Sequence, residues 1–258
     1  QSASSDQRSV VKAAGIIGIG TFASRILGFI RDMVMASLFG ATAAADAFYV
    51  AFRVPSLLRE LFAEGSMSAA FIPVFTEYHQ QKTKREAWEL ASDVFTTLLT
   101  IVTGTVLIGI AVTPVIVWYL APGFHEDPAK LTLAIVLSRV MFPYLLFISL
   151  AALAMGILNS LRAFAAPAFS PLFLNVFMIG CALFLSPQLP EPIVGVAIGV
   201  VAGGAAQFAM QLPGLARRGF LCGWRFEPGH PGVRRIGRLR VPSLLGLSGT
   251  QINLTAST

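Results

Sequence analysis

Long apolar runs separated by short polar segments dominate the sequence. A helix crosses a bilayer with about 20 mostly apolar residues, and six runs reach that length. We therefore expect an all-α fold, a polytopic membrane protein with six transmembrane helices. The expected spans are Ser9–Phe39, Ala44–Tyr78, Ala87–Leu120, Lys130–Leu158, Ala168–Ser186 and Ile193–Leu215.

The second run is unusually long and contains Pro55, Gly65 and Pro73. Proline removes an internal hydrogen bond, so we expect either a kinked helix or one helix with an amphipathic extension. A further apolar segment begins near Val241 and reaches Thr258. This organisation predicts a six-helix lobe over residues 1–220. It also predicts a basic cytoplasmic loop and the incomplete start of a seventh helix over residues 221–258.

Composition and charge support a membrane protein. The 258 residues are 55% hydrophobic and only 12% charged, which is too apolar for a soluble domain. The net charge of +6 does not indicate nucleic-acid binding, because the basic residues lie in short loops and form no stripe with aromatic residues. Basic residues collect in alternate loops, around 8–12, 82–85, 162 and 217–240. The positive-inside rule then predicts a cytoplasmic N-terminus.

The sequence shows no catalytic or metal-binding constellation. His79, His125 and His230 are scattered among loops, and Cys181 and Cys222 fall in different environments without a metal-binding spacing. We therefore expect a protein that is not an enzyme and that has no metal and no cofactor.

Small residues recur within the expected spans. Gly199 and Gly203 have the spacing that lets two membrane helices approach closely. We expect these two residues to serve helix packing.

Charged residues interrupt the apolar runs, mainly the first two. A charge at mid-depth costs about 2.5–3.5 kcal/mol on insertion scales, so these groups need ion pairs, a water-filled cavity, or both. The arginines in or near the spans are Arg25, Arg31, Arg53, Arg59 and Arg139, and the neighbouring acids are Asp32, Asp46, Glu60 and Glu64.

Helix geometry limits the choices for these charges. Arg25 lies about 18 Å along the helix from Ala13, too deep for its side chain to reach the interface. Asp46, Arg53 and Glu60 are spaced by seven and share one helix face, so Arg53 could pair with either acid. Arg139 is expected to reach the interface or pair locally. The remaining arginines suggest a hydrated cationic cavity, whose natural ligand is an anion such as phosphate.

The run "SRILGFIRDMVMASLFGATAAADAFYVAFRVPSLLRELFAEGSMSAAFIPVFTEY" resembles the N-terminal signature of the MurJ/MviN lipid II flippases. That family belongs to the multidrug, oligosaccharidyl-lipid and polysaccharide exporter superfamily. Further similar segments are Ala121–Phe124, Phe142–Ser160, Phe164–Gly180 and Gln211–Leu215.

The resemblance implies the N-lobe of a two-lobe exporter of the bacterial inner membrane. It also implies movement of lipid II, an undecaprenyl-diphosphate-linked muropeptide, by alternating access. The implied partners are this lipid-linked diphosphate, membrane lipids and cell-wall synthesis proteins, with no nucleic acid. Alternatives are an ion-coupled small-molecule or other polysaccharide-lipid exporter of the superfamily, or a non-transporting membrane scaffold.

The resemblance also assigns roles to the charged residues. It implies that a central cavity binds the diphosphate and head group of the substrate. The expected substrate-binding residues are Arg25, Arg31, Arg59 and Asp46, and the expected supporting ion-pair residues are Asp32, Arg53, Glu60 and Glu64.

Overall fold

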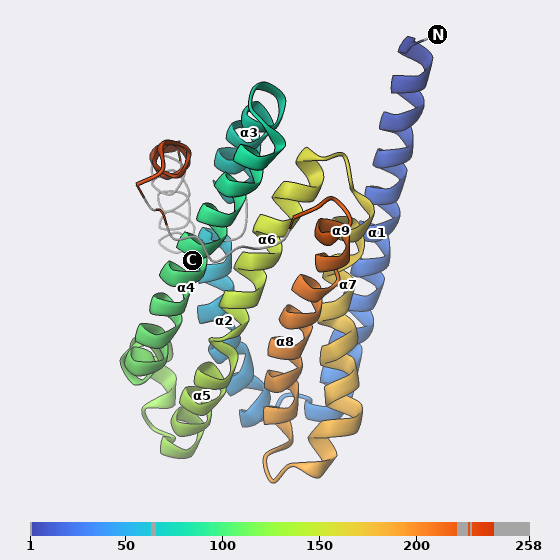
Figure 1. Ribbon diagram of the computed structural model, residues 1–258. Helices are drawn as coiled ribbons and strands as arrows, with labels where there is room; N and C mark the ends of the chain where they lie inside the picture. Colours follow the sequence, from blue (N-terminus) through green and yellow to red (C-terminus); the bar gives the residue numbers. More distant parts are fainter. Residues whose placement is uncertain (1, 63–65, 221–226, 228, 240–258) are drawn as a thin grey trace, which may run out of the picture.

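The computed structural model describes residues 2–62, 66–220, 227 and 229–239. The expected all-α class is confirmed, because the regular elements in these ranges are helices (Figure 1). The helices of eight or more residues are α1 (Ser2–Phe39), α2 (Ala43–Phe62), α3 (Ser66–Gln81), α4 (Lys84–Leu120), α5 (Pro128–Met141), α6 (Tyr144–Ser160), α7 (Ala165–Gly180) and α8 (Pro192–Ala209). The shorter elements are η1 (Pro122–Phe124), η2 (Cys181–Leu185), η3 (Ser186–Gln188) and α9 (Leu212–Ala216).

Local sequence signals fix several helix ends. Thr83 and Glu86 form a capping box at the start of α4, in which each side chain accepts a hydrogen bond from the other residue's backbone N–H. Asp127 caps α5 by accepting from two backbone N–H groups, and Pro128 occupies the first helical position. Gly40 ends α1 with a φ of 53°, in the left-handed region that glycine tolerates.

The expected second span contains both α2 and α3, and residues 63–65 between them lie outside the described ranges. The helix α2 continues through Pro55 and ends at Phe62, and α3 begins at Ser66. The described residues contain five helical segments long and apolar enough to cross a membrane, so the expected six is one too many by this measure. Four charged side chains within the 20 residues of α2 account for its absence from that set. The five segments are Ala14–Phe39, Lys84–Leu120, Pro128–Ser160, Ala165–Gln188 and Pro192–Ala216.

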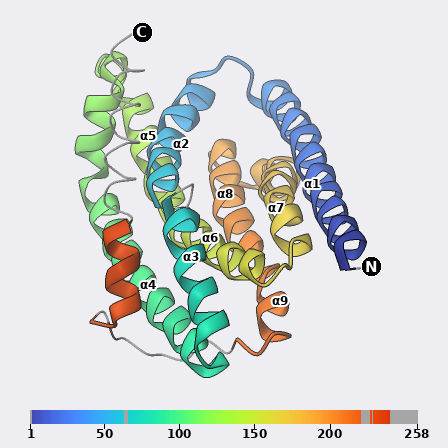
Figure 2. The same cartoon turned by 90° about the horizontal axis from the view of Figure 1, so that it is seen from above.

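The helices form an arc in which α6 and α8 are central. The helix α6 packs on α8, α3 and α4, whereas α8 packs on α7 and α6. At the two ends of the arc, α1 packs along α7 and α2 packs along α5. In the view from above, α7 and α8 lie between α1 and α2 (Figure 2). The first two helices therefore diverge from the turn that joins them.

Glycines make the close contact between α7 and α8. A Cβ at Gly199 would lie 3.0 Å from the Phe177 carbonyl oxygen, and one at Gly203 would lie 2.8 Å from the Leu174 Cα. The expectation that Gly199 and Gly203 serve packing is therefore confirmed. A Cβ at a third glycine, Gly195, would lie 2.8 Å from the backbone of Ser186. The three glycines therefore form one continuous face of α8 that packs closely on the preceding helical segment.

The basic segment after α9 is partly helical. Residues 231–239 form a helix where the sequence suggested a loop. Its buried Ile236 joins the apolar core formed with α3, α4 and α6. Arg235 makes an ion pair with Glu77 at 2.9 Å. This segment is therefore docked on the lobe through α3 and α4. The expected seventh helix, from Val241 onward, lies outside the described residues.

Candidate functional site

Arg31 is held by two neighbours at the contact between α1 and α7. Its Nε and Nη2 atoms donate to Oδ1 of Asp32 at 3.0 and 2.8 Å. Its Nη1 atom donates to Oδ1 of Asn175 at 3.0 Å, and the Nδ2 of Asn175 donates to the Ser24 carbonyl at 3.2 Å. A guanidinium carries five N–H donors. Three of the five are used here, so two remain for a ligand.

The spacing of small residues explains this contact. Gly20, Ser24, Gly28 and Arg31 recur at intervals of four, four and three, which places them on one face of α1. Gly20 meets the Ala168 backbone, and a Cβ at Gly28 would lie 3.9 Å from the Asn175 amide nitrogen. Small residues thus let α7 approach closely enough for Asn175, which is 6% exposed, to reach the guanidinium.

Arg25 occupies another face of α1 and is exposed. Its six-residue separation from Arg31 turns it about 120° around the helix. Arg25 makes no hydrogen bond or ion pair with the described residues. It belongs to the segment Ala14–Phe39, which is long and apolar enough to cross a membrane. Unpaired charge in that setting needs water or a partner beyond the described ranges.

Asp46 forms an ion pair at the other end of the arc, where α2 packs along α5. Its carboxylate accepts a hydrogen bond from Nζ of Lys130 at 2.7 Å, and this ion pair joins α2 to α5. The same ammonium lies 4.4 Å from the centre of the Phe124 ring, a distance at which cation–π attraction operates. The Asp46 side chain is 58% exposed, so part of it is accessible from outside the lobe.

The pairing expected for Arg53 is wrong. Asp46 binds Lys130, and Arg53 is exposed without a hydrogen bond or ion pair to the described residues. Seven helical residues span about 10.5 Å along the axis, so a shared face did not bring Arg53 to Asp46 or Glu60. The packed neighbour α5 supplies a basic group closer to Asp46 than its own helix does.

The other expected residues of α2 lie near its C-terminal end. Arg59 and Glu60 are half-buried and both take part in polar or electrostatic interactions. Glu64, expected to support an ion pair, lies outside the described residues. Arg139 donates from Nε to the Ile110 carbonyl at 3.3 Å. It therefore bonds locally to α4, which is one of the two outcomes expected for this residue.

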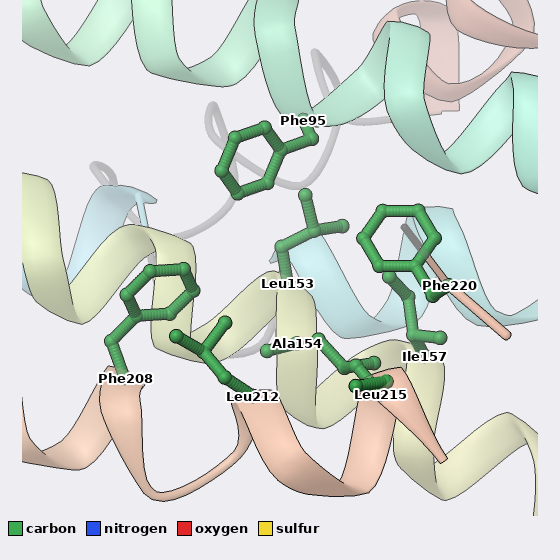
Figure 3. A pocket seen from close by; sticks show the side chains of 9 residues that line it. Phe95, Leu153, Ala154, Ile157, Phe208, Leu212, Leu215 and Phe220 are labelled. Atoms are coloured by element: carbon green, nitrogen blue, oxygen red, sulfur yellow. The ribbon is translucent and has the colours of Figure 1, made fainter. Parts of the chain in front are cut away.

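The predicted arginines do not line the apolar groove found among the described residues. This groove lies between α4, α6, α8 and α9 (Figure 3). Arg25 and Arg31 instead belong to α1, whereas Arg53 and Arg59 belong to α2. The structure thus presents these groups on two diverging helices and leaves their common binding site a prediction.

Three further polar or charged residues were not singled out from the sequence as partners or candidates. Asn175 and Lys130 reach their partners across 144 and 84 residues, and no local pattern reveals such contacts. Asp93 is fully buried in α4, within the apolar segment Lys84–Leu120. The sequence alone could have indicated Asp93, because an acidic residue inside an apolar membrane span is by itself a candidate functional residue. Among the described residues, no three His, Cys, Asp or Glu side chains gather to hold a metal ion.

Comparison with known proteins decides the family. The family described as "Lipid II flippase MurJ" matches residues 35–258. The chain belongs to the MurJ family. A probable lipid II flippase MurJ of Vibrio cholerae is 44% identical over 96% of this chain, and the lipid II flippase MurJ of Burkholderia cenocepacia is 39% identical over 92%. The chain spans about half the length of these MurJ relatives, 48% and 47% respectively.

Solved structures agree with this family. A lipid II flippase MurJ in an inward closed conformation superposes with a TM-score of 0.74 at 28% identity, covering 92% of this chain and 48% of that one. A superfamily transporter from Pyrococcus furiosus gives a TM-score of 0.65 at 17% identity, over 96% of this chain and 54% of its own. The second likeness concerns the fold alone. Together with the five long apolar helices, family membership identifies a multi-pass protein of the bacterial inner membrane.

Proposed function

We propose that this chain forms the N-terminal lobe of a flippase that moves lipid II across the bacterial inner membrane by alternating access. The observation that carries the proposal is the match to the MurJ family over residues 35–258. The lobe itself adds arginines with free donor capacity inside apolar helices. In this proposal residues 1–220 are the lobe, and residues 221–258 lead into a seventh helix.

The charges of α1 and α2 provide the physical basis of the proposed site. Arg25 and Arg53 are exposed, and each would cost about 2.5–3.5 kcal/mol if it faced lipid at mid-depth. A hydrated cavity completed by the rest of the protein removes that cost and attracts an anion. The lipid diphosphate is the proposed anion, because guanidinium groups bind phosphate oxygens bidentately.

Each site residue has a defined role in this proposal. Arg31 presents its two remaining N–H groups to the diphosphate from a fixed position, since Asp32 and Asn175 hold the guanidinium. Arg25 and Arg59 supply further positive charge, and the exposed part of Asp46 contacts the head group. Arg53 adds charge to the cavity, whereas Glu60 and Glu64 orient the basic groups of α2.

The proposed orientation places the N-terminus in the cytoplasm. The start of α1, the α3–α4 turn and the α6–α7 turn lie at one end of the bundle (Figure 1). These segments carry Arg8, Lys12, Lys82, Lys84 and Arg162, and positive charge favours the cytoplasmic side. The chain's role is transport and not catalysis. Its proposed partners are the lipid-linked substrate, membrane lipids and cell-wall synthesis proteins.

A chimeric protein tests the proposal. This chain replaces the matching half of the Vibrio cholerae relative, and the chimera is expressed in cells depleted of their own flippase. We expect the chimera to restore growth, and an Arg59→Ala chimera to fail at equal membrane abundance. An Arg139→Ala chimera is the matched control, because Arg139 is also an arginine of an apolar segment but bonds a backbone carbonyl. Full rescue by Arg59→Ala would contradict the proposed role of Arg59.

The alternatives have less support. A small-molecule exporter gains no support from the Pyrococcus furiosus structure, because that structure is 17% identical and its likeness concerns the fold alone. A scaffold without transport leaves the exposed Arg25 and Arg53 without a physical reason.

A further inference from the structure

The apolar groove lies between α4, α6, α8 and α9, whereas the arginines of α1 belong to a helix that packs along α7. Its lining contains no polar side chain, and it holds about 570 Å³ of atom-free space including its open mouth. Figure 3 shows α4 contributing Phe95, α6 contributing Leu153 and Ile157, and α9 contributing Leu212 and Leu215. The groove therefore has the chemistry of a site for a hydrocarbon chain.

The groove has a buried floor and an open edge. Leu153, Ile157 and Leu215 are each at most 3% exposed, whereas Leu212 is 43% exposed. Phe95 stacks with Phe208 at a centroid distance of 6.3 Å and closes one end. A linear apolar ligand could thus enter from the lipid side along Leu212.

Basic residues lie on or near the turn that follows α9, next to Phe220 of the groove. Arg218 donates from Nη1 to the Gly214 carbonyl at 3.0 Å, so its guanidinium is anchored to α9. Lys84 approaches the same turn, since its Nζ lies 3.6 Å from the position of a Cβ on Gly219. Arg217 is exposed on that turn. Positive charge next to an apolar groove matches a ligand with an anionic head and an apolar tail.

We propose that this groove binds an anionic glycerophospholipid. One acyl chain occupies the groove between α4, α6 and α9, and the phosphate lies between Arg218 and Lys84. Charge complementarity selects the head group, because a basic side chain near a membrane surface favours an anionic lipid by about 1 kcal/mol. The bound lipid fills space between α4 and α9, so it stabilises the cytoplasmic half of the lobe.

The test measures lipid binding to the purified protein by native mass spectrometry. Phosphatidylglycerol is compared with phosphatidylcholine of the same chains, and water-soluble glycerol phosphate serves as the head group without a tail. We expect phosphatidylglycerol to bind more tightly than phosphatidylcholine, by about fivefold for each contributing charge. Glycerol phosphate should bind at least ten times more weakly than phosphatidylglycerol.

Two variants separate the tail from the head group. Ala216→Trp fills the groove mouth and should reduce binding of both phospholipids, with Ala111→Trp on an exposed face of α4 as its control. Arg218→Gln should reduce only the preference for phosphatidylglycerol, with the exposed Arg85→Gln as its control. Equal binding of the two lipids, or binding of phosphatidylglycerol unaffected by Ala216→Trp, would overturn the proposal. Dimers that block lipid binding would also overturn it, by assigning the groove to a second copy.

Discussion

Arg31 on α1 and Asn175 on α7 are joined by a hydrogen bond of 3.0 Å. Asn175 makes two hydrogen bonds to α1: its Oδ1 accepts from the Arg31 guanidinium, and its Nδ2 donates to the Ser24 carbonyl. This arrangement orients a charged group by means of a buried amide on the neighbouring helix. A cation that is fixed in this way loses little conformational entropy when a ligand binds.

Replacing Asn175 by Leu tests this positioning. The change removes both hydrogen bonds at similar side-chain volume, and we expect a loss of about 1–3 kcal/mol in the free energy of unfolding. Transport by the chimera should fall more than its abundance does, because Arg31 loses its fixed orientation. Gln188→Leu, an exposed amide of the same segment, is the control. Wild-type transport by Asn175→Leu would show that the orientation of Arg31 is unimportant.

The Asp46–Lys130 ion pair is expected to stabilise the contact between α2 and α5. Its Asp46 side chain is more than half exposed, so a double-mutant cycle with Asp46→Asn and Lys130→Gln should give a coupling free energy of about 0.2–1 kcal/mol. The measurement is unfolding of the purified protein in detergent. Strictly additive effects of the two substitutions would exclude the pair as a stabilising contact.

Two glycine-to-alanine substitutions in membrane helices should have opposite effects. Gly203→Ala places a Cβ 2.8 Å from the Leu174 Cα and must separate α7 from α8, so the protein is destabilised. Gly104→Ala on α4 meets no atom within 4 Å. The higher helix propensity of alanine then stabilises the protein by about 0.5–1 kcal/mol. Thermal unfolding in detergent measures both, and equal shifts would contradict the packing assigned to Gly203.

The sequence predicted the helical class and the packing role of Gly199 and Gly203, because length, hydrophobicity and small-residue spacing are local properties. It also placed Asp32 beside Arg31 in the chain, where the two form an ion pair. The partners Asn175 and Lys130 come from other helices, so only the tertiary arrangement identifies them. For the same reason, helix periodicity alone assigned Arg53 to the wrong partner.

The absence of α2 from the five spanning segments has a different cause. Hydrophobic length suggested a span from Ala44 to Tyr78, either kinked or extended by an amphipathic segment, but the charges of α2 lower its apolar content below that of the five segments. Two of those charges, Asp46 and Arg59, are also residues of the proposed site. A rule based on hydrophobicity alone therefore omits a helix whose polar residues belong to that site.

Transport of labelled lipid II is the most direct test of the central claim. The purified chimera is reconstituted into vesicles, and the fraction of lipid II that reaches the far leaflet is measured for wild type, Arg25→Ala and Arg139→Ala. Loss of a charged hydrogen bond to phosphate corresponds to about 1.5–3 kcal/mol, so Arg25→Ala should slow transport at least tenfold while Arg139→Ala should not. Equal rates for all three proteins would contradict the assignment of Arg25 to the diphosphate site.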